Sequence, residues 1–154
     1  MGVMKRGTKT KVSQVKAFPI PDRKGPTMSA VVRDHVSDFA TIYTDEFASY
    51  RPLKFTHDHE IVIHSRGEYV RGDVHTNTIE GFWSLFERQV IGQHHFVSIK
   101  HLQRYLDERT WSYNNRGEED LFWLVMVRLA IKAAMPYAKL TEGPSASPRT
   151  IRRS

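Results

Sequence analysis

The sequence predicts a single α/β domain in which short strands come early and helices come late. Three observations support this prediction. Short β-branched and aromatic runs occur in the first half, whereas apolar residues in the second half recur with helical spacing. The chain has 154 residues, a length typical of one domain. Hydrophobic residues make up 40% of it, which is enough for a packed core and excludes global disorder.

The first half is predicted to contain strands that share one sheet. Val, Ile, Thr and aromatic residues favour a pleated, half-buried backbone, and they cluster at residues 12–18, 41–44 and 60–64. Between the first two strands, Gly25 and Pro26 open a predicted helix over residues 27–36. A helical turn at residues 47–50 is expected to end at Pro52.

The second half is predicted to be helical. Residues 76–90 carry an apolar stripe at helical spacing, and we expect it to pack on the sheet through Ile79, Phe82, Trp83 and Phe86. A second helix is expected over residues 98–114, with its inward side formed by Ile99, Leu102, Tyr105, Leu106 and Tyr113. A third is expected over residues 119–135, ended by Pro136. The core is expected to include Trp83, Trp111 and Trp123.

Composition narrows the classes of function. The chain has no Cys, which excludes disulfides, thiolate metal sites and cysteine nucleophiles. No apolar run approaches the ~20 residues of a membrane span, so an intracellular protein is expected. The net charge is +6, from 23 Lys and Arg against 17 Asp and Glu, and favours a polyanionic partner such as nucleic acid. Residues 1–11 are predicted to be a flexible basic lead-in, 12–136 the folded domain, and 137–154 a disordered basic tail.

Two carboxylates are the first candidates for chemistry. Asp45 follows the predicted strand 41–44, and Glu80 lies on the polar side of the helix 76–90. Carboxylates on separate rigid elements are what two-metal phosphoryl transfer uses, since Mg²⁺ prefers oxygen ligands. The alternative is structural: Asp45 would cap a turn and Glu80 would lie on a solvated helix face.

Histidine and basic residues provide further candidates. A zinc site formed by His57, His59 and His64 is possible, although their spacing matches no standard pattern. Cations in the middle of the chain suit contacts with nucleic-acid phosphates, the alternative being an ordinary charged surface. These candidates are Arg66, Arg71, Arg88, Lys100, His101 and Arg104.

Four segments together resemble a known family. They are residues 43–50 (YTDEFASY), 72–85 (GDVHTNTIEGFWSL), 98–108 (SIKHLQRYLDE) and 113–116 (YNNR). This series resembles the catalytic domain of bacterial insertion-sequence transposases of the ISXO type, over roughly residues 10 to 130. The block HTNTIEGFW is long and specific, and it follows the Thr-Asp-Glu block in the family's order.

The resemblance implies a ribonuclease-H-like transposase catalytic domain over residues 12–136, followed by C-terminal helices. It also implies a DDE-type mechanism with Mg²⁺ or Mn²⁺, in which activated water nicks DNA at the element's end and the freed 3′-hydroxyl attacks target DNA. Asp45 would be the second acidic residue of the triad, and Glu80, with Asn77 as second choice, would be the third. The implied partners are DNA and a second transposase copy, identical or full-length, and the implied location is the bacterial nucleoid in the cytoplasm.

Two departures from the family pattern matter. No Asp precedes Asp22, so the first acidic ligand and the strand that carries it are expected to be missing, leaving the ribonuclease-H-like fold incomplete. The family's Lys seven residues after the third acid is here Glu87, which reverses a charge near the expected DNA path. We therefore expect a truncated or degenerate transposase with little activity, or alternatively a non-catalytic DNA-binding or interaction module derived from one.

Overall fold

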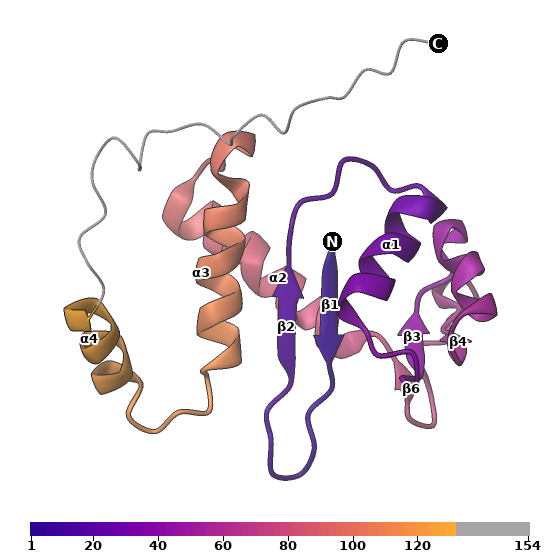
Figure 1. Ribbon diagram of the computed structural model, residues 1–154, viewed down its shortest axis with the longest axis horizontal. Coiled ribbons are helices and arrows are strands. Elements are labelled where there is room, and N and C mark those ends of the chain that lie inside the picture. Colours follow the sequence, from indigo (N-terminus) through magenta and orange to yellow (C-terminus); the bar gives the residue numbers. More distant parts are fainter. Residues whose placement is uncertain (132–154) are drawn as a thin grey trace.

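The computed structural model describes residues 1–131, which form small sheets surrounded by helices (Figure 1). The strands are β1 (Gly2–Lys5), β2 (Gln14–Ala17), β3 (Ile42–Thr44), β4 (His59–Ile61), β5 (Val70–Arg71) and β6 (Val74–His75). The α-helices are α1 (Gly25–His35), α2 (Asn77–Gln89), α3 (Leu102–Asn114) and α4 (Leu121–Ile131). Short 3₁₀ or π turns are η1 (Ala48–Phe55), η2 (His64–Arg66), η3 (Val90–His94) and η4 (Ile99–His101).

The prediction that the three strand segments share one sheet is wrong. β2 pairs antiparallel with β1, and β3 pairs parallel with β4, in separate two-stranded sheets. The second edge of β2 is closed by α3: the Asn114 side-chain amide donates to the Val15 carbonyl at 2.8 Å and accepts from the Val15 N–H at 2.7 Å. Gln103 also donates to the Ala17 carbonyl at 3.3 Å. Side chains therefore take the hydrogen bonds that another strand would need.

The expectation of a flexible lead-in is wrong for residues 2–5, because they form β1. Met4 lies opposite Val15, and the Met1 amino group donates to the Phe18 carbonyl at 2.7 Å. Burial lowers the pKa of that amino group. Gly2 permits close packing of β1 on α2, since a Cβ atom there would lie 2.8 Å from Cζ2 of Trp83. The apolar run in β1 is too short to predict a strand without its partner.

The main core lies between the β1–β2 hairpin, α2 and α3. Its buried residues are Val15, Ala17, Phe82, Leu106 and Tyr113, with Trp83 and Phe86 packed against them. The ring of Phe82 meets those of Trp83 and Tyr113 edge-on, at centroid distances of 5.2 and 5.3 Å. This confirms the predicted helix and its apolar face.

α1 packs on η1, where Met28, Val32 and Leu53 are buried, and Val62, directly after β4, is also buried. The helix predicted at 27–36 is confirmed as α1. η1 continues through Pro52 to Phe55, so the expected stop is wrong. The fixed φ of proline is compatible with a 3₁₀ turn, so η1 continues although Pro52 has no N–H group to donate. The strand predicted at 60–64 ends at Ile61, before His64 opens η2.

Two predicted core residues are exposed instead. Ile99 is 92% exposed because η4, a 3₁₀ turn, precedes α3 and changes the phase of the helical face. Trp123 is 65% exposed because α4 stands apart from the main core (Figure 1). The predicted helix end at Pro136 and the tail 137–154 lie outside the described residues. Within residues 1–131, no helix combines the length and the apolar character needed to cross a membrane.

Candidate active site

The parallel pair β3–β4 places two polar segments at the same sheet edge. Asp45 follows β3, and His64 lies three residues beyond the end of β4. The carboxyl ends of parallel strands share one edge, which is where α/β sheets bind ligands. Asp45 is exposed, and its Oδ1 accepts a hydrogen bond from the Phe47 N–H at 3.0 Å. One oxygen of Asp45 therefore caps a turn, as the structural alternative predicted.

Glu46 links these two segments. Its carboxylate accepts hydrogen bonds from the backbone N–H groups of His64 at 2.9 Å and Ser65 at 3.0 Å. Hydrogen bonds from its own backbone N–H and from those two groups hold the pKa of Glu46 below its ordinary value of 4.5. Sequence reasoning missed this residue, although its position beside Asp45 in the Thr-Asp-Glu block was a signal.

Glu80 lies in the first turn of α2, within a polar cluster that we call the His64 cluster (His64, Thr76 and Glu80). Oε1 of Glu80 accepts a hydrogen bond from the Thr76 hydroxyl at 2.5 Å. Nε2 of His64 lies 3.0 Å from the Thr76 hydroxyl oxygen and 3.3 Å from Oε1 of Glu80. Thr76 is the N-cap residue of α2, but its hydroxyl bonds Glu80 instead of a helix N–H group.

His64 therefore contacts both halves of the candidate site. Its backbone N–H binds the residue next to Asp45, and its ring lies against Glu80. The second-choice candidate, Asn77, is exposed at the first position of α2, three residues before Glu80. No spacing pattern in the sequence indicated that His64 contacts both acidic segments.

The donor atoms suit Mg²⁺ in kind. Carboxylate oxygens are its preferred protein ligands, and it commonly binds through one or two carboxylates plus waters and substrate phosphates. Among residues 1–131, no three His, Asp or Glu side chains gather into a metal-binding group. A divalent ion at Asp45 and Glu80 would therefore depend on waters and phosphate oxygens for further ligands.

The histidine zinc hypothesis is wrong for the described residues, because the three rings do not form a metal-binding group. Each ring instead hydrogen-bonds a threonine hydroxyl: His57 binds Thr56 and His59 binds Thr44, both at 2.9 Å. Both rings belong to half-buried residues. Burial, with a smaller contribution from the neighbouring His57, lowers the pKa of His59.

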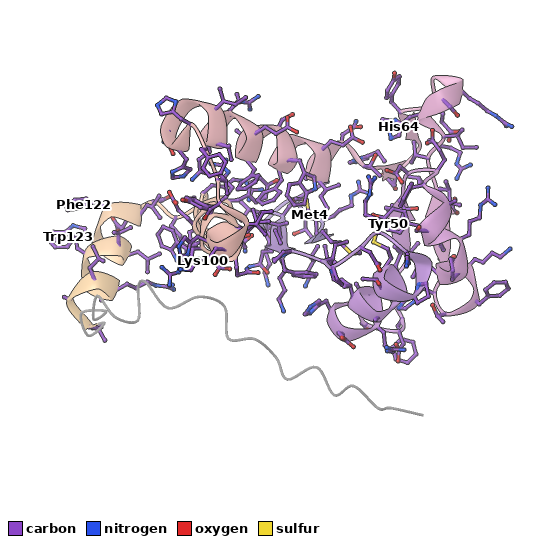
Figure 2. All side chains as sticks on the ribbon, turned by 90° about the horizontal axis from the view of Figure 1, so that it is seen from above. Met4, Tyr50, His64, Lys100, Phe122 and Trp123 are labelled. Carbon is purple, nitrogen blue, oxygen red and sulfur yellow. The ribbon has the colours of Figure 1, made fainter. Side chains whose placement is uncertain are left out.

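The basic candidates do not form one patch. Arg71 pairs with Glu60 at 2.5 Å and lies 3.6 Å from Glu68, so carboxylates balance its charge. Figure 2 shows Lys100 left of centre and His64 on the right-hand side of the molecule, well apart from each other. The exposed candidates besides these are Arg66, Arg88 and Arg104, whereas His101 is half-buried.

Comparison with known proteins identifies the class as a transposase domain. Residues 1–114 match the ISXO2-like transposase domain. The chain belongs to this family, which confirms the resemblance read from its sequence blocks.

Two relatives agree with this assignment. The chain is 42% identical over 80 residues to an uncharacterized protein in transposable element ISH50 of Halobacterium salinarum, covering 49% of this chain and 26% of that protein. It is 25% identical over 102 residues to an uncharacterized transposase-like protein of Haemophilus influenzae, covering 66% and 82% respectively. The chain thus aligns with about a quarter of the first relative's length. No solved structure matches the chain, so the ribonuclease-H-like fold stays a prediction.

Proposed function

We propose that this domain belongs to a metal-dependent DNA strand transferase of the DDE class, with Asp45 and Glu80 as metal ligands. The observation that carries the proposal is the double contact of His64, with Glu46 through its backbone and with Glu80 through its ring. This contact joins the two acidic segments that the family resemblance selects. The substrate of this reaction would be DNA, and the reaction would therefore take place at the nucleoid.

The residues around the site would position the two carboxylates. Thr76 and His64 hold the Glu80 carboxylate through Oε1. Glu46 holds the segment after β4 against the segment after β3. When bound, a divalent ion supplies charge stabilisation to the attacking and leaving oxygens. Asn77 has an amide oxygen near the same helix end and is the second choice for the third ligand.

The proposed reaction has two steps. A water oxygen bonds to the phosphorus of a phosphodiester as the bond from phosphorus to the 3′-oxygen breaks, which frees a 3′-hydroxyl and leaves a 5′-phosphate. That hydroxyl then attacks a target phosphodiester, and a target 3′-hydroxyl leaves. With only two acidic ligands proposed, and with Glu87 adding negative charge, we expect the 154 residues alone to be weakly active in both steps.

Metal binding tests the proposal independently of turnover. Mn²⁺ binding, followed by water-proton relaxation with a short duplex present, should weaken at least about tenfold in Asp45→Asn and Glu80→Gln. Asp34→Asn is the matched control, since Asp34 is an exposed carboxylate on α1, 3.9 Å from Arg33. Equal Mn²⁺ affinity in all three variants would overturn the proposed site.

Plasmid nicking tests the reaction itself. Supercoiled DNA with Mn²⁺ should be nicked slowly by the chain, and not at all by Asp45→Ala. Duplex binding that is indifferent to metal and to Asp45→Ala, without any nicking, would instead support a non-catalytic DNA-binding module.

A further inference from the structure

The loop of the β1–β2 hairpin forms a second polar site, outside the residues proposed for catalysis. It extends past the ends of the two strands (Figure 1). Together with residues at the start of α2 and after α3, it lines a hollow of about 480 Å³, which we call the hairpin hollow. Its side-chain chemistry comes mainly from Arg6, Lys9, Lys11, His75, Thr78 and Arg116.

The lining of the hairpin hollow matches an oxyanion. Four lining residues are Lys or Arg, four carry a hydroxyl group, and none is Asp or Glu. Guanidinium, ammonium and hydroxyl groups donate hydrogen bonds to phosphate oxygens, and the cations also balance the phosphate charge. Because the lining has no carboxylate, no formal negative charge there repels an anion.

The two arginines are held in place without carboxylates. Arg6 donates to the Asp73 carbonyl, lies 2.8 Å from Nε2 of His75, and sits over the Tyr43 ring at 5.5 Å. Arg116 donates to the carbonyls of Ser13 and Tyr113 at 2.8 and 2.6 Å. Within residues 1–131, neither arginine pairs with an acid, unlike Arg71. Their positive charges stay available to a ligand.

The loop itself is closed by its own hydrogen bonds. The Gly7 N–H donates to the Ser13 hydroxyl and the Thr8 N–H to the Lys11 carbonyl, both at 2.9 Å. A Cβ atom at Gly7 would lie 2.5 Å from the Lys11 carbonyl oxygen, so only glycine fits there. These contacts hold the exposed Lys9 and Lys11 at the rim of the hairpin hollow.

The hairpin hollow lies beside the candidate active site. Two of its lining residues, His75 and Thr78, lie one position before and two positions after Thr76, whose hydroxyl bonds Glu80. A DNA strand whose scissile phosphate lay at Glu80 would carry other backbone phosphates past this region. Phosphates are the dominant source of affinity for DNA.

We propose that the hairpin hollow binds a backbone phosphate of duplex DNA, independently of base sequence. The choice of DNA as the source of that phosphate rests on the proposed function. The loop would act as a clamp that fixes the strand relative to Asp45 and Glu80. Its contribution to binding requires no metal, which separates it from the catalytic proposal.

Salt-dependent DNA binding tests this assignment. The variant Lys9→Gln/Lys11→Gln removes two exposed charges from the rim, and Arg33→Gln/Lys54→Gln removes two exposed charges from α1 and η1. Both lower the net charge from +6 to +4, because 6 − 2 = 4. Anisotropy of a labelled duplex in EDTA should show a salt slope reduced by about 0.9 in the rim variant only, the value expected for the loss of one phosphate contact. Equal slopes in the two variants would overturn the proposal.

Two further arms identify the source of the phosphate. Inorganic phosphate alone should shift the amide NMR signals of Thr8, Thr10 and Thr78. Duplex DNA should shift the same signals further, and at a lower ligand concentration than inorganic phosphate needs. Shifts with phosphate but none with duplex would overturn DNA as the ligand and indicate a small-anion site. EDTA removes divalent ions, so these measurements do not depend on nicking activity. A failure of the catalytic proposal can therefore be distinguished from a failure of the phosphate-binding proposal.

Discussion

Helices α3 and α4 show opposite relations between composition and burial. α3 carries four charged residues among its 13, yet it buries Leu106 and Tyr113. α4 has one charged residue, Arg128, among its 11, and none of its residues is buried. The more apolar helix is therefore the more exposed one.

The difference comes from what each helix faces. α3 lies against the β1–β2 hairpin, where Asn114 satisfies both backbone groups of Val15. The contact of α4 with α3 includes Arg128, which lies 5.8 Å from the Trp111 ring centre. Figure 2 shows Phe122 and Trp123 pointing outward, and they are 69% and 65% exposed. Apolar composition favours burial, but a complementary surface is needed to provide it.

The largest expected effect is the difference in stability loss between a buried aromatic residue, Phe82, and an exposed one, Trp123. Phe82→Ala should lower the free energy of unfolding by ~3–5 kcal/mol, because it leaves a cavity in the main core. Trp123→Ala should change it by less than about 0.5 kcal/mol, because most of that ring is exposed. Urea unfolding followed by circular dichroism measures both, and similar losses would contradict the comparison.

The next effect tests how α3 gains its partner. Asn114→Ala should cost ~1–3 kcal/mol, because it leaves the N–H and carbonyl of Val15 without their partners. Asn115→Ala is the matched control: the side chain of Asn115, the C-cap residue of α3, donates one hydrogen bond, to the Trp111 carbonyl, and its loss should cost less. Thermal unfolding of both variants measures the two losses of stability. A larger loss for Asn115→Ala than for Asn114→Ala would show that the β2 edge does not depend on α3.

A smaller effect probes the exposed face of α4. Replacing Phe122 and Trp123 with Ser should reduce binding of a hydrophobic dye while leaving the urea midpoint within error of the parent protein. The physical reason is that the two rings contribute exposed apolar area, ~200–330 Å² for two aromatic side chains two-thirds exposed, but no core packing. A lowered midpoint would mean that α4 is part of the stability core.

The smallest expected effect concerns Glu46, which lies outside both α3 and α4. The pKa of Glu46 is lowered in the folded chain, so its carboxylate contributes stability above the ordinary value of 4.5 and loses that contribution as pH falls through the folded pKa. Glu46→Gln should therefore be less stable than the parent at neutral pH and equal to it at low pH. Unfolding curves at several pH values check this, and a constant difference would be evidence against it.

Local patterns were enough to predict several elements. The stripe from Ile79 to Phe86 predicted α2 and its buried face, because helical periodicity depends on neighbours within two turns. Strand pairing was not predictable in the same way. β1 contains too few apolar residues to stand out, and the edge of β2 is closed by Asn114, 99 positions from Val15.

The candidate site was likewise predictable only in part. Sequence blocks selected Asp45 and Glu80 and led to the family, which the comparison with known proteins confirmed. The role of His64 was not visible, since its partners lie 18 residues before it, at Glu46, and 16 after it, at Glu80. The zinc hypothesis was wrong for a related reason: closeness along the chain did not bring the three histidine rings together.

The sequence by itself determined the family, the order of most helices and strands, the basic charge and the identity of the acidic candidates. Each of these is a property of residue types and short spacings. Only the tertiary structure decided which strands pair, that the apolar α4 is exposed, that His64 connects the acidic segments, and that four cations converge at the hairpin hollow. Those outcomes depend on contacts between residues far apart in the chain, where the backbone must close long loops before any local preference matters.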